Sequence, residues 1–383
     1  MATHHVMLRR SRLAAHLPAF QAAVTSDSPL AITRLHTFPV REPVSRRVYT
    51  IVKIETRGGL TGYGECGSIP AEQIAQTVSL IQGMPATSYE VVRKKLGAIP
   101  GMQAAVNIAL LDIVGKQAKA PIYRVLAGPT RNKARAMTRL SGNDDAALVA
   151  SMTRAREHGY LAFHVPLPPI GSANQGQAFV SATRKRLDAL RAKGGAGVDF
   201  ILDGAGSLSP SDAGIISAAF ETFHLMWFDE PCAMVNSGAL RKVSAERVTP
   251  LGFGRTIHNS TPFQELLREQ SIDVLRPDLA RNGITQIRRM AAMAETYYTA
   301  VAPYHDGGPI GTAAALHLAA SLPNFVIQQI PLPDAEEDQR MRAEIAGAAI
   351  ETVKDGFAPL LTGDGLGIKV NEQALAKYAE RAA

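Results

Sequence analysis

Three carboxylates follow short apolar runs, and an arginine stands in the same series. Asp203 ends the run FILD, Glu230 follows MWFD and Asp278 follows VLRP, while Arg255 follows PLGFG. Successive strands of a β/α barrel present the residues at their carboxyl ends to one mouth. Evenly spaced acids after apolar runs therefore predict a metal site built on neighbouring strands. Arg255 stands where this pattern requires another carboxylate.

Arg255 decides how much metal chemistry is expected. It supplies no ligand atom and keeps its proton under ordinary conditions. A guanidinium about 4 Å from a divalent ion would be repelled by roughly 8 kcal/mol at an effective dielectric of about 20. One hypothesis is that Arg255 pairs with Asp203 and Glu230 as a built-in cation and leaves the site metal-free. The alternative is that it points away, and a weak site uses waters or a neighbour such as Asp229.

Asp203 and Glu230 also have interpretations that involve no metal. Asp203 could cap the helix that follows it, and Glu230 could pair with a basic neighbour. Because both stand in matching strand-end contexts, we expect a metal-site ancestry for the two.

The elements that must position these residues can be read from the apolar pattern. Apolar and polar residues alternate on either side of a Gly-Gly turn between Ala31 and Cys66, which predicts a β-hairpin. The spacing becomes helical from Ala71 to Leu126. Between Arg135 and Ile330 about eight strand-like runs alternate with helix-length segments, as in a β/α barrel. The tail from Gly356 predicts a glycine-rich turn, then a strand and a short helix that return to the cap.

Composition excludes several classes of function. The net charge of +7 is spread among acids, aromatic residues make up only 6%, and no basic stripe for nucleic acid is present. No apolar run approaches the roughly 18 residues that span a bilayer. Cys66 and Cys232 lack metal-ligand spacing, which favours a reduced compartment over a disulfide scaffold. We expect a cytoplasmic protein that binds no nucleic acid or membrane, with at most a mild preference for small anions.

The N-terminus carries paired arginines before a partly apolar stretch, LRRSRLAAHLPAF. It is loosely similar to a twin-arginine export signal, although Arg12 and His16 interrupt what should be an apolar region. The interpretation we favour is an extra helix or arm packed on the body.

From about Ile32 onward, several motifs resemble the enolase superfamily, in the mandelate racemase and muconate lactonizing enzyme group. GLTGYGEC resembles the cap hairpin, NIALLDIVGKQAKAPIYRVLAG the cap helices, and RPDLARNGITQIRRMAAMAE the sixth barrel strand with its helix. VAPYHDGGPIGTAAALHLAASLPNFVIQQ is most similar to the galactonate dehydratase type of sugar-acid dehydratase. Members bind Mg²⁺ through three carboxylates, hold a substrate carboxylate on it and abstract the proton α to that carboxylate.

The resemblance implies an α/β fold: a modified (β/α)7β barrel of the TIM type, with an α+β capping domain formed by the N-terminal region and the C-terminal tail. The expected parts are an N-terminal extension (1–30), the cap (31–134), the barrel (135–345) and a segment that returns to the cap (346–383). Relatives assemble as dimers to octamers, so a homo-oligomer is expected.

The resemblance also assigns the metal ligands. Asp203 and Glu230 match the first two Mg²⁺ ligands, and Arg255 occupies the position of the third. Mg²⁺ is thus implied by the family and opposed by Arg255. If the metal is absent, Arg255 could salt-bridge a substrate carboxylate or the old metal ligands.

The proton-transfer machinery differs from the family as well. His164 and Pro166 stand where many relatives carry lysines; His164 is a candidate acid, base or hydrogen-bond donor, or a structural residue. Asp278 matches the aspartate that orients a catalytic histidine. Tyr304 falls at the position of that histidine, with His305 one residue later. A tyrosine, with a pKa of about 10, would be a poor base, and we expect His305 to line the cavity.

One further position, at the close of the seventh or eighth strand, has lost its charge. Gln329 replaces the expected glutamate; it can hydrogen-bond a substrate but cannot donate a proton as an acid does.

Two functional hypotheses follow. The first is a lyase, a dehydratase of a hydroxy or sugar acid, that acts by α-proton abstraction. The second is a metal-independent or catalytically silent homologue that binds a small anionic ligand. A racemase would need bases on both faces, and only His164 could serve on the lysine side.

The specificity of either protein would lie in a cap loop between Thr37 and Arg47. Arg41, Arg46 and Arg47 could meet an anion there, or they could be solvated loop charges.

Overall fold

The computed structural model describes residues 27–169, 176–233, 237–245, 248–258 and 260–379. The arginine-rich N-terminal stretch considered as an export signal lies outside these ranges. Within them, no helix combines the length and the apolar character needed to cross a bilayer.

The cap begins with a three-stranded antiparallel sheet in the order β1, β2, β3. Its strands are β1 (Ile32–Arg41), β2 (Val48–Thr56) and β3 (Thr61–Cys66). The helices that follow are α1 (Ala71–Ile81), α2 (Tyr89–Lys95), α3 (Pro100–Gln117) and α4 (Ile122–Val125), with a 3₁₀ turn at Ala86–Ser88. The sheet packs on α3, whose side chains are buried over most of its length.

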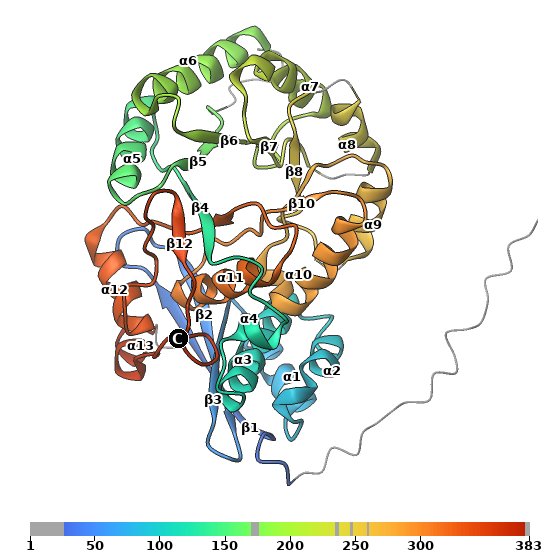
Figure 1. The fold of residues 1–383 in the computed structure, drawn as a ribbon, viewed down its shortest axis with the longest axis vertical. Helices are drawn as coiled ribbons and strands as arrows, with labels where there is room; N and C mark the ends of the chain where they lie inside the picture. Colours follow the sequence, from blue (N-terminus) through green and yellow to red (C-terminus); the bar gives the residue numbers. More distant parts are fainter. Residues whose placement is uncertain (1–26, 170–175, 234–236, 246–247, 259, 380–383) are drawn as a thin grey trace, which may run out of the picture.

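The second body is a ring of parallel strands surrounded by helices (Figure 1). Its strands are β4 (Lys133–Arg139), β5 (Ala162–Pro166), β6 (Asp199–Asp203), β7 (Trp227–Asp229), β8 (Leu251–Phe253), β9 (Val274–Leu275), β10 (Ala300–Val301) and β11 (Gln328–Gln329). The helices between them are α5 (Asp145–Glu157), α6 (Gly176–Gly194), α7 (Pro210–Ala219), α8 (Ser237–Ser244), α9 (Thr261–Arg268), α10 (Leu279–Glu295) and α11 (Pro309–Ser321).

Two contacts between the last strands and the first strand close the ring. Val301 of β10 forms a parallel bridge with Phe325, and the segment that follows becomes β11, which pairs with β4. Eight parallel strands joined by seven helices give the predicted (β/α)7β barrel, and the fold class with its α+β cap is confirmed.

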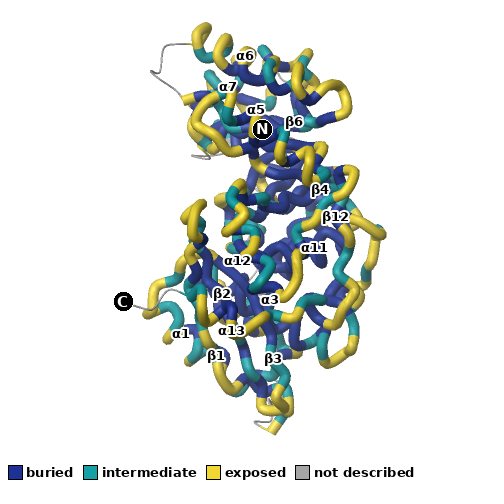
Figure 2. Tube along the Cα trace, turned by 90° about the vertical axis from the view of Figure 1, so that its left-hand side faces the viewer, coloured by how far each residue is buried: buried dark blue, intermediate teal, exposed yellow. Residues whose placement is uncertain are grey.

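Two apolar clusters hold the barrel together. Inward-facing residues fill the ring itself, and these are Met137, Ala162, Ile201, Trp227, Val274, Ala302 and Ile327. A larger cluster lies between the strands and the surrounding helices. Figure 2 shows buried segments running through the middle of both bodies and exposed segments on the outer turns. Helix α10 packs against α3 and β3, and α11 packs against β3 and α4, so these two helices join the cap to the barrel.

The tail contacts both bodies. Its strand β12 (Phe357–Pro359) pairs antiparallel with β4, and α12 (Glu336–Ala346) precedes it. Helix α13 (Glu372–Tyr378) then returns to the cap, where Glu372 accepts hydrogen bonds from Tyr63 Oη at 2.6 Å and Lys53 Nζ at 2.9 Å. The short helix was predicted correctly. The strand was placed wrongly, because it lies before the glycine-rich turn and not after it.

Gly64 allows the close contact between the cap sheet and α3, and it provides a test of this packing. A Cβ there would lie 1.9 Å from the carbonyl oxygen of Ala105. We predict that Gly64→Ala lowers the free energy of unfolding by roughly 1–3 kcal/mol, because overpacking forces backbone shifts. Gly67→Ala is the matched control, since nothing lies within 4 Å of its Cβ position. Equal urea midpoints for the two variants would contradict the packing described.

Candidate functional site

The carboxyl ends of β6, β7 and β8 bring three of the predicted residues together. Asp203 is the last residue of β6, Glu230 follows β7, and Arg255 lies two residues beyond β8. Parallel pairing of β6 with β7 and of β7 with β8 sets these ends side by side. All three side chains are largely buried, and that of Arg255 is 12% exposed.

Arg255 points inward and forms a fork on Asp203. Its Nη2 donates to Oδ1 of Asp203 at 2.5 Å, and Nη1 donates to Oδ2 at 3.4 Å. Nε lies 3.7 Å from Oδ2 of Asp229 and 3.8 Å from Oε1 of Glu230. The guanidinium is therefore centred on Asp203, with two further carboxylates at the edge of its reach.

Glu230 is fixed by backbone amides. Its Oε1 accepts hydrogen bonds from the N–H groups of Gly254 at 2.7 Å and Arg255 at 2.8 Å. Burial, followed by the charge of Asp229, raises its pKa from the ordinary 4.5 to about 7. Near neutral pH this carboxyl can carry a proton.

Asp229 is the acceptor at the centre of the site. It takes hydrogen bonds from Trp227 Nε1 at 2.9 Å and Arg276 Nε at 3.0 Å, and it lies 2.9 Å from Nε2 of His164. Burial alone would raise its pKa, but the guanidinium of Arg276 and the contact with His164 hold the pKa well below its usual range. Asp229 thus stays ionised inside the barrel.

Arg276 was missed in the sequence, although it stands two residues before Asp278 in VLRPD. It is fully buried and donates from Nη1 to the carbonyl oxygen of Ala302 at 2.7 Å. Its Nη2 donates to Oε1 of Gln329 at 3.2 Å. We expected Gln329 to bind substrate, but its side chain is fully buried and accepts a hydrogen bond from Arg276.

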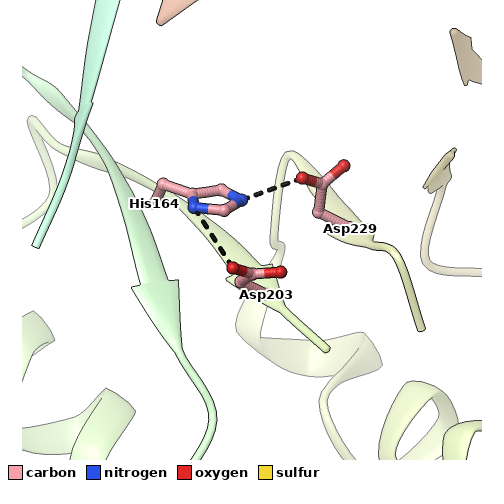
Figure 3. Close-up of side chains that lie close together, drawn as sticks. All are labelled: His164, Asp203 and Asp229. Atoms are coloured by element: carbon pink, nitrogen blue, oxygen red, sulfur yellow. Dashed lines mark hydrogen bonds and ion pairs between the residues drawn. The ribbon is translucent and has the colours of Figure 1, made fainter. Parts of the chain in front are cut away.

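His164 lies between two carboxylates (Figure 3). Its Nε2 faces Asp229 at 2.9 Å and its Nδ1 lies 3.6 Å from Oδ2 of Asp203. The side chain is fully buried and lines neither of the two cavities at the barrel mouth. Its position favours a structural or electrostatic role over direct contact with a ligand.

The same three residues are the ones that could hold a metal in the described part of the chain. Ligand atoms of His164, Asp203 and Asp229 lie within 4.8 Å of one another. However, both oxygens of Asp203 accept from Arg255, and the oxygens of Asp229 are taken by Arg276 and other donors. A divalent cation bound by these three residues would lie beside two guanidinium groups, which already neutralise the charges of Asp203 and Asp229. These residues do not fit a divalent metal ion.

The residues after β10 correct one prediction. Tyr304, and not His305, lines the cavity beside Asp278. Nε2 of His305 lies 3.1 Å from the carbonyl oxygen of Gly308 and 3.1 Å from Oγ1 of Thr312, away from the mouth. Consecutive residues of an extended segment face opposite sides, so only one of the pair can enter the cavity.

Neither residue of that pair offers a base. Burial and the charge of Arg342 lower the pKa of His305 to about 3. Burial, followed by the charge of Asp306, raises the pKa of Tyr304 above its usual range. Asp278 forms the N-terminal cap of α10, accepting from the N–H of Ala280, and burial raises its pKa to about 6.

Two cavities together make the mouth of the barrel. One, of about 610 Å³, is lined by residues that follow β6 to β10, among them Glu230, Arg255, Asp278 and Tyr304. The other, of about 510 Å³, is lined by residues at the ends of β4, β5, β10 and β11 and by the cap loop. Every strand end of the ring therefore borders one half of the mouth or the other.

The cap loop closes over the second half. Asp338 accepts hydrogen bonds from the backbone N–H groups of Val44 at 2.9 Å and Ser45 at 2.7 Å. Nη2 of Arg47 donates to Asp306 at 3.1 Å. Of the three arginines considered in this loop, Arg47 reaches the cavity, whereas Arg41 and Arg46 are exposed.

Comparisons with known proteins agree with this architecture. Residues 147–374 match the family described as Enolase C-terminal domain-like, and residues 33–127 match Mandelate racemase / muconate lactonizing enzyme, N-terminal domain. The chain is 29% identical to D-galactonate dehydratase of Variovorax paradoxus (strain S110) over 373 residues, which cover 90% of this chain and 94% of that protein.

Solved structures resemble the chain over nearly its whole length. A mandelate racemase/muconate lactonizing enzyme-like protein of Roseovarius sp. TM1035 superposes with a TM-score of 0.83 at 23% identity, covering 92% of this chain and 96% of that one. Another from Rubrobacter xylanophilus DSM 9941 has a TM-score of 0.82 at 24% identity, covering 92% and 98%. At these identities the likeness supports the fold.

The raised pKa of Glu230 predicts a pH dependence of stability. In the folded protein the pKa of Glu230 is about 7, against 4.5 for an unperturbed carboxyl. The stability that the bound proton contributes is therefore lost as the pH rises from 4.5 through about 7. We expect Glu230→Gln, which keeps an acceptor for both amides, to gain stability relative to wild type between pH 5 and pH 8. Urea unfolding of both proteins at the two pH values measures this. The raised pKa would be contradicted if the difference in unfolding free energy between the two proteins were the same at both pH values.

Proposed function

The chain belongs to the enolase C-terminal domain-like family, with the N-terminal domain of the mandelate racemase and muconate lactonizing enzyme group, and on this premise we propose that it binds a small carboxylate ligand at the barrel mouth without a divalent metal. One observation carries the proposal. The guanidinium of Arg255 forks onto Asp203, where the family resemblance expects a metal ligand.

The charges inside the barrel support this proposal. Arg255 and Arg276 bring two positive charges to Asp203 and Asp229, both of which have pKa values held below the usual range. Each carboxylate thus has a cation of its own. Glu230, by contrast, has a raised pKa and is the weakest remaining partner for Mg²⁺. A divalent ion bound at this position would have to displace Arg255 from its buried pair with Asp203.

The proton-transfer groups support the same conclusion. Abstraction of a proton α to a carboxylate needs a cation to take up the developing charge and a base near neutral pH. His164 is enclosed between two carboxylates, and His305 lies outside the mouth. The geometry favours ligand binding over the family's metal-assisted chemistry.

A second candidate is a dehydratase of a hydroxy or sugar acid. It is favoured by the 29% identity to D-galactonate dehydratase across 90% of the chain. Without a metal, such an enzyme would have to use Glu230 or Asp278 for proton transfer, since these carboxyl groups face the larger cavity. Incubation with D-galactonate, with and without Mg²⁺, followed by NMR detection of a 2-keto acid, separates this candidate from the first.

Calorimetry with Mg²⁺ tests the proposal directly. We predict that the chelator-treated wild-type protein gives no saturable Mg²⁺ binding, because Arg255 supplies the cation. Arg255→Glu removes that charge and restores a third carboxylate, so we expect this variant to bind one ion per chain.

Arg281→Glu is the matched control for this experiment. It adds an acid to the same cavity but leaves the pair of Arg255 and Asp203 intact, so it should not bind Mg²⁺. Saturable binding of Mg²⁺ by wild type would contradict the proposal of metal-independent binding and favour the dehydratase.

A further inference from the structure

The half of the mouth under the cap loop has a charge pattern of its own. This cavity, of about 510 Å³, is bordered by three acids and two arginines: Asp306, Asp334, Asp338, Arg47 and Arg139. Which of these charges is free decides what the cavity can bind.

Each of the three acids is already engaged. Asp306 accepts from Arg47 at 3.1 Å, and Asp338 accepts from the two backbone amides of the cap loop. Asp334 accepts from Ser141 at 2.5 Å and pairs with Arg154 at 2.6 Å. None of these carboxylates lacks a donor.

Arg139 is different. Its guanidinium makes no ion pair or hydrogen bond with any residue in the described ranges. Along β4 the side chains alternate, and Met137 belongs to the cluster inside the ring, so Arg139 faces inward at the next layer toward the mouth. Its register partner on β5 is His164, which also faces inward. The strand therefore aims an uncompensated cation into the cavity.

The other half of the mouth is less suited to an anion. Arg255 is engaged by Asp203, and Nε of Arg281 lies 3.8 Å from Oδ2 of Asp278. The two carboxyl groups there, Glu230 and Asp278, repel negative charge when ionised. The carboxyl groups of Glu230 and Asp278 and the phenol of Tyr304 line this cavity, and all three can form hydrogen bonds with hydroxyl groups. At the end of β10, Tyr304 borders one half and Asp306, two residues later, borders the other, so the two halves lie next to each other there.

We infer that Arg139, with Arg47 beside it, binds the carboxylate of the ligand, and that the hydroxyl groups of a hydroxy or sugar acid extend toward Glu230 and Asp278. This inference rests on the proposed metal-free binding function and gives the ligand its orientation. The carboxylate lies under the cap loop, on the opposite half of the mouth from Arg255. A planar guanidinium without a partner is well matched to a carboxylate in this position.

Calorimetric titration with sodium D-galactonate tests this orientation, with the uncharged polyol galactitol as the ligand control. We expect wild type to bind galactonate more tightly than galactitol. Arg139→Gln should bind galactonate at least about tenfold more weakly and lose the preference over galactitol, because a charge-assisted hydrogen bond is removed. Arg139→Lys should recover part of the affinity. Arg139 is exposed, so these variants should fold.

Arg34→Gln, on the exposed face of the cap sheet, is the protein control and should bind as wild type does. If Arg139→Gln binds galactonate as tightly as wild type, the orientation is wrong while the proposed function stands. If wild type binds neither galactonate nor inorganic phosphate, or binds galactitol as tightly as galactonate, both the orientation and the anion-binding function are overturned.

Discussion

The pair formed by Arg255 and Asp203 is the interaction on which the chemistry of the barrel mouth depends. Three buried acids at the ends of β6 and β7 would repel one another if no cation lay among them. Arg255 supplies one positive charge at the mouth, and Arg276 supplies another deeper in the ring, where it holds Asp229. Breaking a buried pair of this kind typically costs about 3–5 kcal/mol, because the remaining charge has no partner. The arrangement is therefore both an electrostatic requirement of the fold and an obstacle to a metal ion.

This internal compensation changes what each half of the mouth can do. The half near Arg255 presents carboxyl groups with raised pKa values and a tyrosine, which suit neutral hydroxyl groups. In the half under the cap loop, the guanidinium of Arg139 forms no hydrogen bond or ion pair with the residues that the structure describes, which suits an anion. The cap loop is fixed over this second half by Asp338. Which groups of a ligand bind in each half, and therefore how the ligand is oriented, thus depends on which charged side chains already have partners within the protein.

Much of this could be predicted from the sequence. The barrel followed from about eight apolar runs with helix-length segments between them. The inward position of Arg255 was one of two hypotheses, and the complementary charges of Asp203 and Glu230 favoured it. The choice between Tyr304 and His305 could not be made in the same way, because a shift of one residue reverses the side that a strand residue faces. Arg276 was missed because its partners, Asp229 and Gln329, lie far away in the sequence. The orientation of Arg139 likewise depends on the ring being closed.

Soaking crystals in Mn²⁺, a heavier substitute for Mg²⁺ with similar oxygen ligands, tests the central claim most directly. An anomalous difference map then reports any bound metal by position. Metal-free chemistry predicts no peak between Asp203 and Glu230, with the guanidinium of Arg255 still forked onto Asp203. A peak at that position, with Arg255 turned away from Asp203, would contradict the claim that an arginine replaces the metal ion.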